Sequence, residues 1–117
     1  MTERPTGHRL ETVCVGLREL ADVDFQRRVW TGQSLPQEYS SFVEAVETVF
    51  DDSGLQPDLD RGRPVFSDEI DAELRELGTL LKRVKVDRTA NEIIDDPLMY
   101  EVRRRASAIY SMLNGRT

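Results

Sequence analysis

The sequence predicts an all-α protein, an irregular antiparallel bundle of four main helices with one or two short helices. Three observations lead to this prediction. Apolar residues recur every three or four positions along four stretches. Most of these stretches follow a Ser, Thr or Asp, which can cap a helix, and a Gly often ends them. No stretch alternates between apolar and polar residues as a half-buried strand would, and the nearest candidate, 84–86, is too short. We therefore expect a single helical domain over residues 8–115, preceded by a disordered segment over 1–7.

The N-terminal third contains one long and one short predicted helix. The first covers about residues 8–21, and its apolar stripe comprises Leu10, Val13, Cys14, Leu17 and Leu20. Asp22 or Asp24 then caps a short helix that carries Phe25 and Val29, and Gly32 ends it.

Ser41 begins the next predicted helix. Together with Glu44 it forms a capping-box pattern, in which each side chain bonds the other residue's backbone amide. The helix ends near Gly54, and its apolar stripe comprises Phe42, Val46, Val49 and Phe50. Residues 53–66 contain two Gly and two Pro, so we expect them to form the longest loop.

The C-terminal half contains two long predicted helices with a short one between them. Ser67 caps the first long helix, whose stripe comprises Ile70, Leu74, Leu77, Leu81 and Val84. Thr89 caps a single turn through Ile94. Asp96 and Pro97 begin the last helix, because Pro at the first helical position gives up only an unbonded amide. This helix ends at Gly115, and its stripe comprises Leu98, Val102, Ala106, Ile109 and Leu113.

The negative charge lies in the middle of the chain. The net charge is −6 over 117 residues, but residues 38–76 hold twelve Asp and Glu against three Arg, a local balance of −9. An acidic chain of this kind is not attracted to nucleic acid or to an anionic membrane, and it favours a basic partner. Fourteen of the sixteen basic residues are Arg, which we expect to reflect a GC-rich bacterial genome.

The acidic residues form the outer faces of two predicted helices. Glu44, Glu47 and Asp51 share one face, and Glu69, Glu73 and Glu76 share the other. Like charges one turn apart destabilise a helix by about 0.2–0.5 kcal/mol per pair. Two interpretations follow: a docking surface for a basic partner, or a solvated face that only keeps the protein soluble.

Trp30, the single Trp, lies next to Arg27 and Arg28. Trp and Arg are enriched in the energetically dominant parts of protein interfaces, so Trp30 is a candidate contact residue. The alternative is that Trp30 belongs to the core. Arg103, Arg104 and Arg105 point about 100° apart on a helix and therefore cannot form one nucleic-acid patch; we expect Arg105 to pair with Glu101.

Residues that carry catalysis or bind metals are scarce. His8 is the single His and Cys14 the single Cys, and Cys14 falls on an apolar stripe as a small core residue would. Asp58, Asp60 and Glu69 match three positions of a calcium loop, but Arg63 occupies the position that requires Gly. We therefore expect no catalytic residue, no bound metal and no cofactor.

The sequence predicts a small acidic, non-enzymatic protein-interaction domain of the bacterial cytoplasm: a regulator, an adaptor or a toxin-neutralising immunity-type protein. We expect a basic protein partner, no nucleic acid and no membrane, with a homodimer possible. One alternative is a small carboxylate-based metal-binding protein or hydrolase, built from Asp51, Asp52, Asp95 and Asp96. Another is a structural subunit of a homo-oligomer, with an interface that includes Met99, Tyr100, Tyr110 and Met112.

Overall fold

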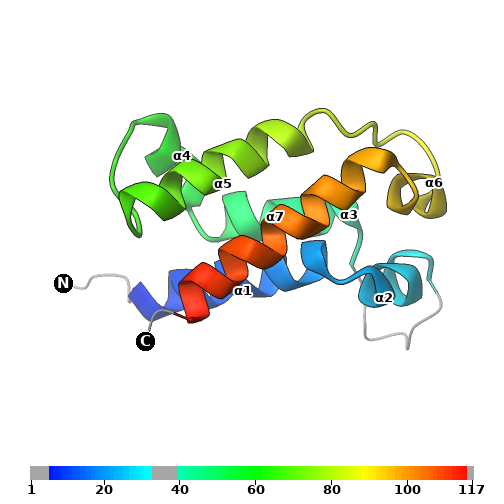
Figure 1. Cartoon of the computed structure of the whole chain (residues 1–117), viewed down its shortest axis with the longest axis horizontal. Coiled ribbons are helices and arrows are strands. Elements are labelled where there is room, and N and C mark those ends of the chain that lie inside the picture. Colours follow the sequence, from blue (N-terminus) through cyan, green and yellow to red (C-terminus); the bar gives the residue numbers. More distant parts are fainter. Residues whose placement is uncertain (1–5, 33–39, 116–117) are drawn as a thin grey trace.

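A computed structural model describes residues 6–32 and 40–115, and of residues 6–8 it describes the backbone alone. Among these residues every regular element is helical, so the all-α prediction is confirmed (Figure 1). The elements are α1 (Thr6–Ala21), α2 (Val23–Phe25) with the π-helical turn η1 (Gln26–Trp30), α3 (Phe42–Glu47) with the π-helical turn η2 (Thr48–Asp52), α4 (Leu55–Asp60), α5 (Asp68–Leu81), α6 (Ala90–Ile94) and α7 (Pro97–Asn114). The predicted disordered segment 1–7 lies mostly outside the described residues, and α1 begins two residues before the predicted start.

The predicted caps account for most helix starts. The side chains of Asp22, Ser41 and Ser67 each accept a hydrogen bond of 3.1 Å from the backbone amide three residues on. Asp96 accepts one of 2.8 Å from the Leu98 amide. Thr89 begins α6 with a complete capping box. Local side-chain chemistry therefore sets where these helices begin.

The prediction of a loop over 53–66 is wrong for its first half, which contains α4. The Ser53 hydroxyl accepts a 3.1 Å hydrogen bond from the Leu55 amide, and Pro57 falls within the first turn, where its missing N–H has no helical partner to lose. Arg9 on α1 donates to the Ser53 carbonyl at 3.1 Å and pairs with Asp58 at 3.0 Å. These contacts, which are distant in sequence, hold α4 against the end of η2.

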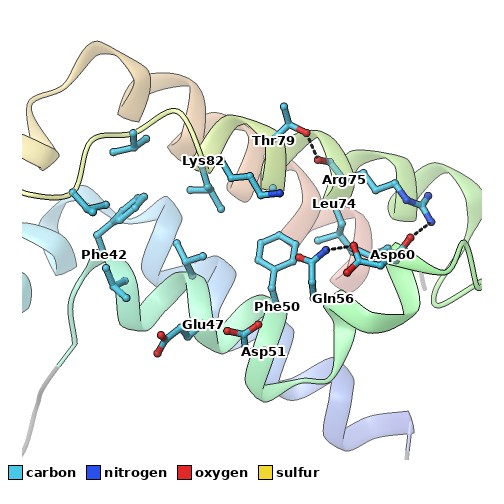
Figure 2. Close-up of a pocket in the computed structure, with 17 residues that line it drawn as sticks. Phe42, Glu47, Phe50, Asp51, Gln56, Asp60, Leu74, Arg75, Thr79 and Lys82 are labelled. Atoms are coloured by element: carbon cyan, nitrogen blue, oxygen red, sulfur yellow. Dashed lines mark hydrogen bonds between the residues drawn. The ribbon is translucent and has the colours of Figure 1, made fainter.

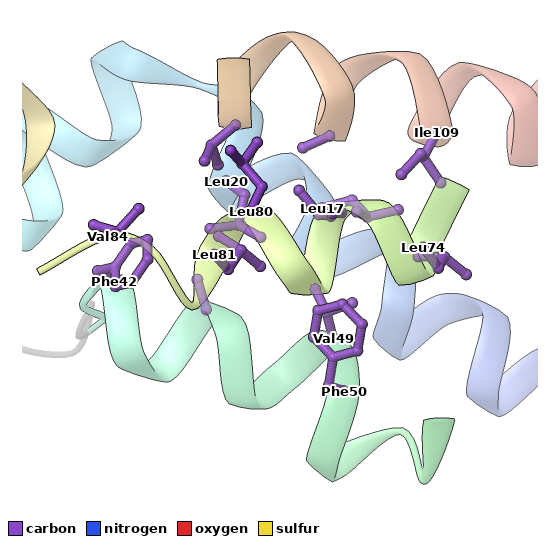
Figure 3. Close-up of a cluster of buried hydrophobic side chains, with 14 of the residues drawn as sticks. Leu17, Leu20, Phe42, Val49, Phe50, Leu74, Leu80, Leu81, Val84 and Ile109 are labelled. Atoms are coloured by element: carbon purple, nitrogen blue, oxygen red, sulfur yellow. The ribbon is translucent and has the colours of Figure 1, made fainter. Parts of the chain in front are cut away.

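The packing is centred on α1 and α7. These two helices lie against each other and run in opposite directions (Figure 1). On its other side α1 contacts α3 and η2, while α5 packs on α7. Figure 3 shows Leu17, Val49, Leu74 and Ile109, one from each of these layers, in the shared core. The antiparallel four-helix bundle itself stays a prediction.

Two predicted core positions of α1 lie at the edge of the core. Leu10 and Cys14 are half-buried, whereas Val13, Leu17 and Leu20 on the same stripe are fully buried. The Asn114 amide lies 3.5 Å from the Cys14 sulfur. No helix within residues 6–32 and 40–115 combines the length and the apolar character that crossing a bilayer requires.

Candidate partner-binding groove

A groove of about 640 Å³ lies between α5 and the α3–η2 segment (Figure 2). The α4 helix borders one end, through Gln56, Leu59 and Asp60, and the segment after α5 borders the other, through Val84 and Val86. The side chains that line its floor are apolar: Phe42, Val46, Phe50, Leu74, Leu81 and Val84. Two further lining residues, Val43 and Val86, are 45% and 50% exposed. The apolar surface therefore extends beyond the floor to one end of the groove.

The π-helical turn η2 shapes one wall. Helices of the α type rarely contain such turns, and those that occur are frequently found at functional sites. Val49 within this turn is fully buried in the core, whereas Phe50 and Asp51, which follow it, line the groove. Figure 2 shows the Phe50 ring directed from η2 toward α5. One short turn thus contributes to the core, to the floor and to the rim.

The two walls carry opposite charge. Glu47 and Asp51 line the α3–η2 wall, while Arg75 and Lys82 line the α5 wall (Figure 2). Glu47 and Asp51 are exposed and form no ion pair within the described part of the chain. On the opposite wall a guanidinium nitrogen of Arg75 donates to the Leu59 carbonyl at 3.3 Å. A charged ligand would therefore meet carboxylates on one side and cations on the other.

Glu44, the third predicted acid of this helix, does not line the groove. It is exposed, and its charge helps to raise the pKa of Glu19 on α1. The main cause of that raised pKa is burial of the Glu19 carboxyl, while the hydrogen bond from Ser40 and the charge of Arg18 oppose it.

The acidic residues of α5 lie outside the groove. Neither Glu69, Glu73 nor Glu76 lines it, and Glu73 pairs with Arg105 of α7 at 3.1 Å. Helical periodicity explains this arrangement. With the stripe that contains Leu74 and Leu77 buried, Glu73 projects toward α7, Arg75 reaches the Leu59 carbonyl of α4, and Lys82 lines the groove. The structure does not bring the two predicted acidic faces together in this groove.

Trp30 does not line the groove but packs against Phe42, which does. It is 8% exposed, and its ring meets Phe42 edge to face with 6.0 Å between centroids. No hydrogen-bond partner for its indole nitrogen is found within the described residues. Arg27, three residues before Trp30 in the sequence, pairs with Asp95 at 2.9 Å. Both residues are therefore engaged within the fold.

Sequence analysis missed Gly78, which lies in the last turn of α5 and lines the groove. A Gly inside a helix costs about 0.5–1 kcal/mol relative to Ala. Neither backbone conformation nor packing requires it: its φ is not positive, and a Cβ built there would lie 3.6 Å from the nearest Phe50 ring atom, an ordinary contact. What the missing side chain provides is space in the groove. The signal in the sequence is a Gly where the helical pattern favours a larger residue.

Several residues named for other functions are engaged within the fold. Asp95 and Asp96 pair with Arg27 and Arg88, and Met99 is fully buried. Arg104 and Arg105 both pair with Glu101, and the Arg105 pair was predicted. The pKa of Glu101 is lowered, and the hydrogen bond from Arg104 is the largest cause. In the described portion, no three His, Cys, Asp or Glu side chains lie close enough together to hold a metal ion.

Arg103 is also engaged within the fold. It donates to the Gln26 side chain at 3.0 Å and to the Ile94 carbonyl at 3.3 Å, and it lies over the Tyr100 ring. Burial is the main cause of its lowered pKa. Each Arg of the 103–105 run therefore has contacts within the fold.

Comparison with protein-family models, with curated proteins and with solved structures finds no match to this chain.

Proposed function

We propose that this protein is a non-enzymatic interaction domain of the bacterial cytoplasm, a regulator, adaptor or immunity-type protein, and that its groove binds a basic, partly apolar segment of a partner protein. One observation carries the proposal. An apolar groove has Glu47 and Asp51 exposed along one wall, with no cation of the described chain paired to either. We retain the interpretation of the four main helices as an irregular antiparallel bundle that holds the two walls apart.

The floor and the rim would contribute differently to binding. Covering the groove would remove from water the apolar side chains that are still partly or largely exposed there, Val43, Val46 and Val86, at about 25 cal/mol per Å² of apolar surface. Phe50 and Leu74 are already buried in the free protein. The carboxylates would speed encounter with a basic segment and disfavour acidic competitors. A protein segment suits the groove better than a small molecule, because the exposed Val43 and Val86 extend the apolar surface past the floor.

The test uses a photoreactive phenylalanine analogue placed at Val43 or Val86 in the full chain and activated in the source cell. Positions Val15 and Tyr100, which are exposed but do not line the groove, serve as controls. We expect cross-linking to one partner from the groove positions only. Mass spectrometry of the cross-linked peptide should locate a segment that is basic and apolar. Equal capture from the control positions would contradict the proposal.

Two double variants with the same change in charge separate docking from solubility. Glu47→Lys with Asp51→Lys reverses the groove wall, and Glu69→Lys with Glu76→Lys reverses exposed acids that do not line the groove. We expect the first pair to reduce cross-linking by about tenfold or more, because like charges would then face each other, and the second to have a much smaller effect. Circular dichroism confirms that both fold. Equal losses would show that only net charge matters, as for a solvated face.

A further inference from the structure

We infer that the mouth of the groove is complementary to itself, and that a second copy of this chain covers it in a dimer whose two-fold axis runs along the groove. We define the mouth by six exposed lining residues: Val43, Glu47 and Asp51 on the α3–η2 rim, and Arg75, Lys82 and Val86 on the α5 rim. The inference goes beyond the proposed function, because the dimer needs no other protein.

The two rims carry opposite charges that do not pair with each other. Glu47 and Asp51 lie on one rim, and Arg75 and Lys82 lie on the other (Figure 2). Within residues 6–32 and 40–115, no ion pair joins the rims. A surface that carries both charges would satisfy both rims, whereas a purely basic surface would satisfy only the acidic rim. The same chain carries such a surface in the mouth itself.

The two walls run in opposite directions along the groove. A Cβ on Gly78 of α5 would lie 3.6 Å from the Phe50 ring of η2, so these two residues lie opposite each other. Val43 precedes Phe50 along one wall, and Val86 follows Gly78 along the other, at the end of the groove away from α4. These two exposed side chains therefore lie toward the same end, one on each rim.

A half-turn about an axis along the groove matches the two copies. This rotation places the α3–η2 rim of one copy over the α5 rim of the other and leaves positions along the groove unchanged. Glu47 would then face Lys82 of the second copy, and Val43 would face Val86, with each contact formed twice. An axis across the groove would place like-charged rims together, so the charges select the first arrangement.

The size of the mouth predicts a weak dimer. The α5 helix is 14 residues long, or about 21 Å, and two helices side by side are about 20 Å wide. Such a face buries about 400 Å² per copy, half of the roughly 800 Å² that standard interfaces bury on each partner. We therefore expect a Kd above about 1 μM, so a partner that binds more tightly can displace the second copy.

Sedimentation equilibrium of the full chain tests for self-association, at protein concentrations from about 1 μM to 1 mM. We expect monomers to convert into dimers over this range, and added salt to weaken the dimer because it screens exposed charges. Growth beyond the dimer would contradict the inference, because a two-fold interface is closed once two copies meet.

Single charge reversals test the geometry. Glu47→Lys and Lys82→Glu each place two like-charged pairs in the dimer, so we expect each to weaken self-association by about tenfold or more. An equal mixture of these two variants should dimerise, because every facing pair then has opposite charges. Glu69→Lys and Arg83→Glu make the same changes in charge at exposed positions outside the groove, and they should have little effect. Circular dichroism confirms that all four variants fold.

The outcomes separate this inference from the proposed function. Dimerisation that is lost in each single variant and restored in the mixture supports the inference. A natural protein that stays monomeric up to about 1 mM, a mixture that does not dimerise, or equal losses in the control variants overturn it. The proposed function then still stands if Val43 and Val86 cross-link another protein in the cell. Cross-links only between copies of this chain would overturn the proposed function and leave the dimer.

Discussion

Two glycines inside helices show how one residue type serves opposite purposes. A Cβ on Gly16 of α1 would lie 2.4 Å from a Val49 methyl and 3.0 Å from the Val49 backbone nitrogen, so this Gly permits close packing. A Cβ on Gly78 would meet only the Phe50 ring at ordinary contact distance. Gly16 therefore serves the core, and Gly78 leaves the groove open.

The same substitution should change stability in opposite directions at these two positions. We expect Gly16→Ala to lower the free energy of unfolding by about 1–3 kcal/mol, because α1 and η2 must move apart. Gly78→Ala should raise it by up to about 1 kcal/mol, through helix propensity. Urea unfolding measures both changes. A loss of stability at Gly78 would show that packing, rather than the space in the groove, requires this Gly.

At the scale of elements, side-chain oxygens position the helix starts, and the start of α7 is the most heavily bonded. The pKa of Asp96 lies below its usual value of 3.8, first because the Leu98 amide donates to its carboxylate and second because Arg88 does so. The Arg88 guanidinium lies 2.6 Å from the carboxylate and also donates to the Lys85 carbonyl at 2.8 Å. Arg88 therefore connects the segment after α5 to the start of α7.

We expect Asp96→Ala to lower the free energy of unfolding by about 1–2 kcal/mol, because the cap is lost. Asp96→Asn keeps a capping oxygen and should lose less.

Because the pKa of Asp96 is lower in the folded state than in the unfolded state, its carboxylate stabilises the fold above pH 3.8. This stabilisation is lost as the pH falls through the lower pKa that Asp96 has in the folded protein. The difference in free energy of unfolding between the natural protein and Asp96→Asn should therefore shrink in acid. Denaturant unfolding across pH 2–7 measures this difference. A difference that does not change with pH would contradict the expectation.

At the scale of the whole molecule, the fold has a central pair of helices and one side that is less tightly packed. α1 and α7 lie together, α3 and η2 pack on α1, and α5 packs on α7, while the groove separates α5 from α3. On its groove side α5 is covered only in part, by the Phe50 ring of η2 and by α4. An occupant between α5 and α3 would cover that face.

This arrangement predicts a gradient of local stability. We expect backbone amides in α1 and α7 to exchange hydrogen most slowly, and those in α5 to exchange faster, because the groove side of α5 is only partly covered by other elements. Hydrogen exchange followed by mass spectrometry measures this order in the free protein. A groove-binding peptide should then slow exchange in α5 more than in α7. Equal protection of α5 and α7 in the free protein would contradict the gradient.

Much of the architecture could be predicted from the sequence because it depends on local chemistry. A Ser, Thr or Asp before an apolar stripe satisfies the first free amides of a helix, whatever the rest of the chain does. The caps at Ser41, Ser67 and Asp96 were predictable for this reason. The α4 helix was not, because Arg9, which helps to hold it in place, is more than forty residues away in sequence.

The candidate site was predictable only in part. Helical periodicity identified Glu47 and Asp51 as exposed acids on one face, and both line the groove. Periodicity also placed Glu69, Glu73 and Glu76 on one face of α5, but it carries no information on which neighbour that face meets. The pairing of Glu73 with Arg105 and the position of Gly78 opposite Phe50 depend on how the helices pack.

The sequence by itself determined that the chain is helical, where most of its helices begin, and that its middle is acidic, because each of these depends on residues within a few turns of one another. Only the tertiary structure decided that α5 and α3 stand apart with an apolar floor between them, and that cations line one wall and carboxylates the other. The physical reason is that a groove is a property of the distance between two helices, and the side chains that set this distance here come from α1 and α7.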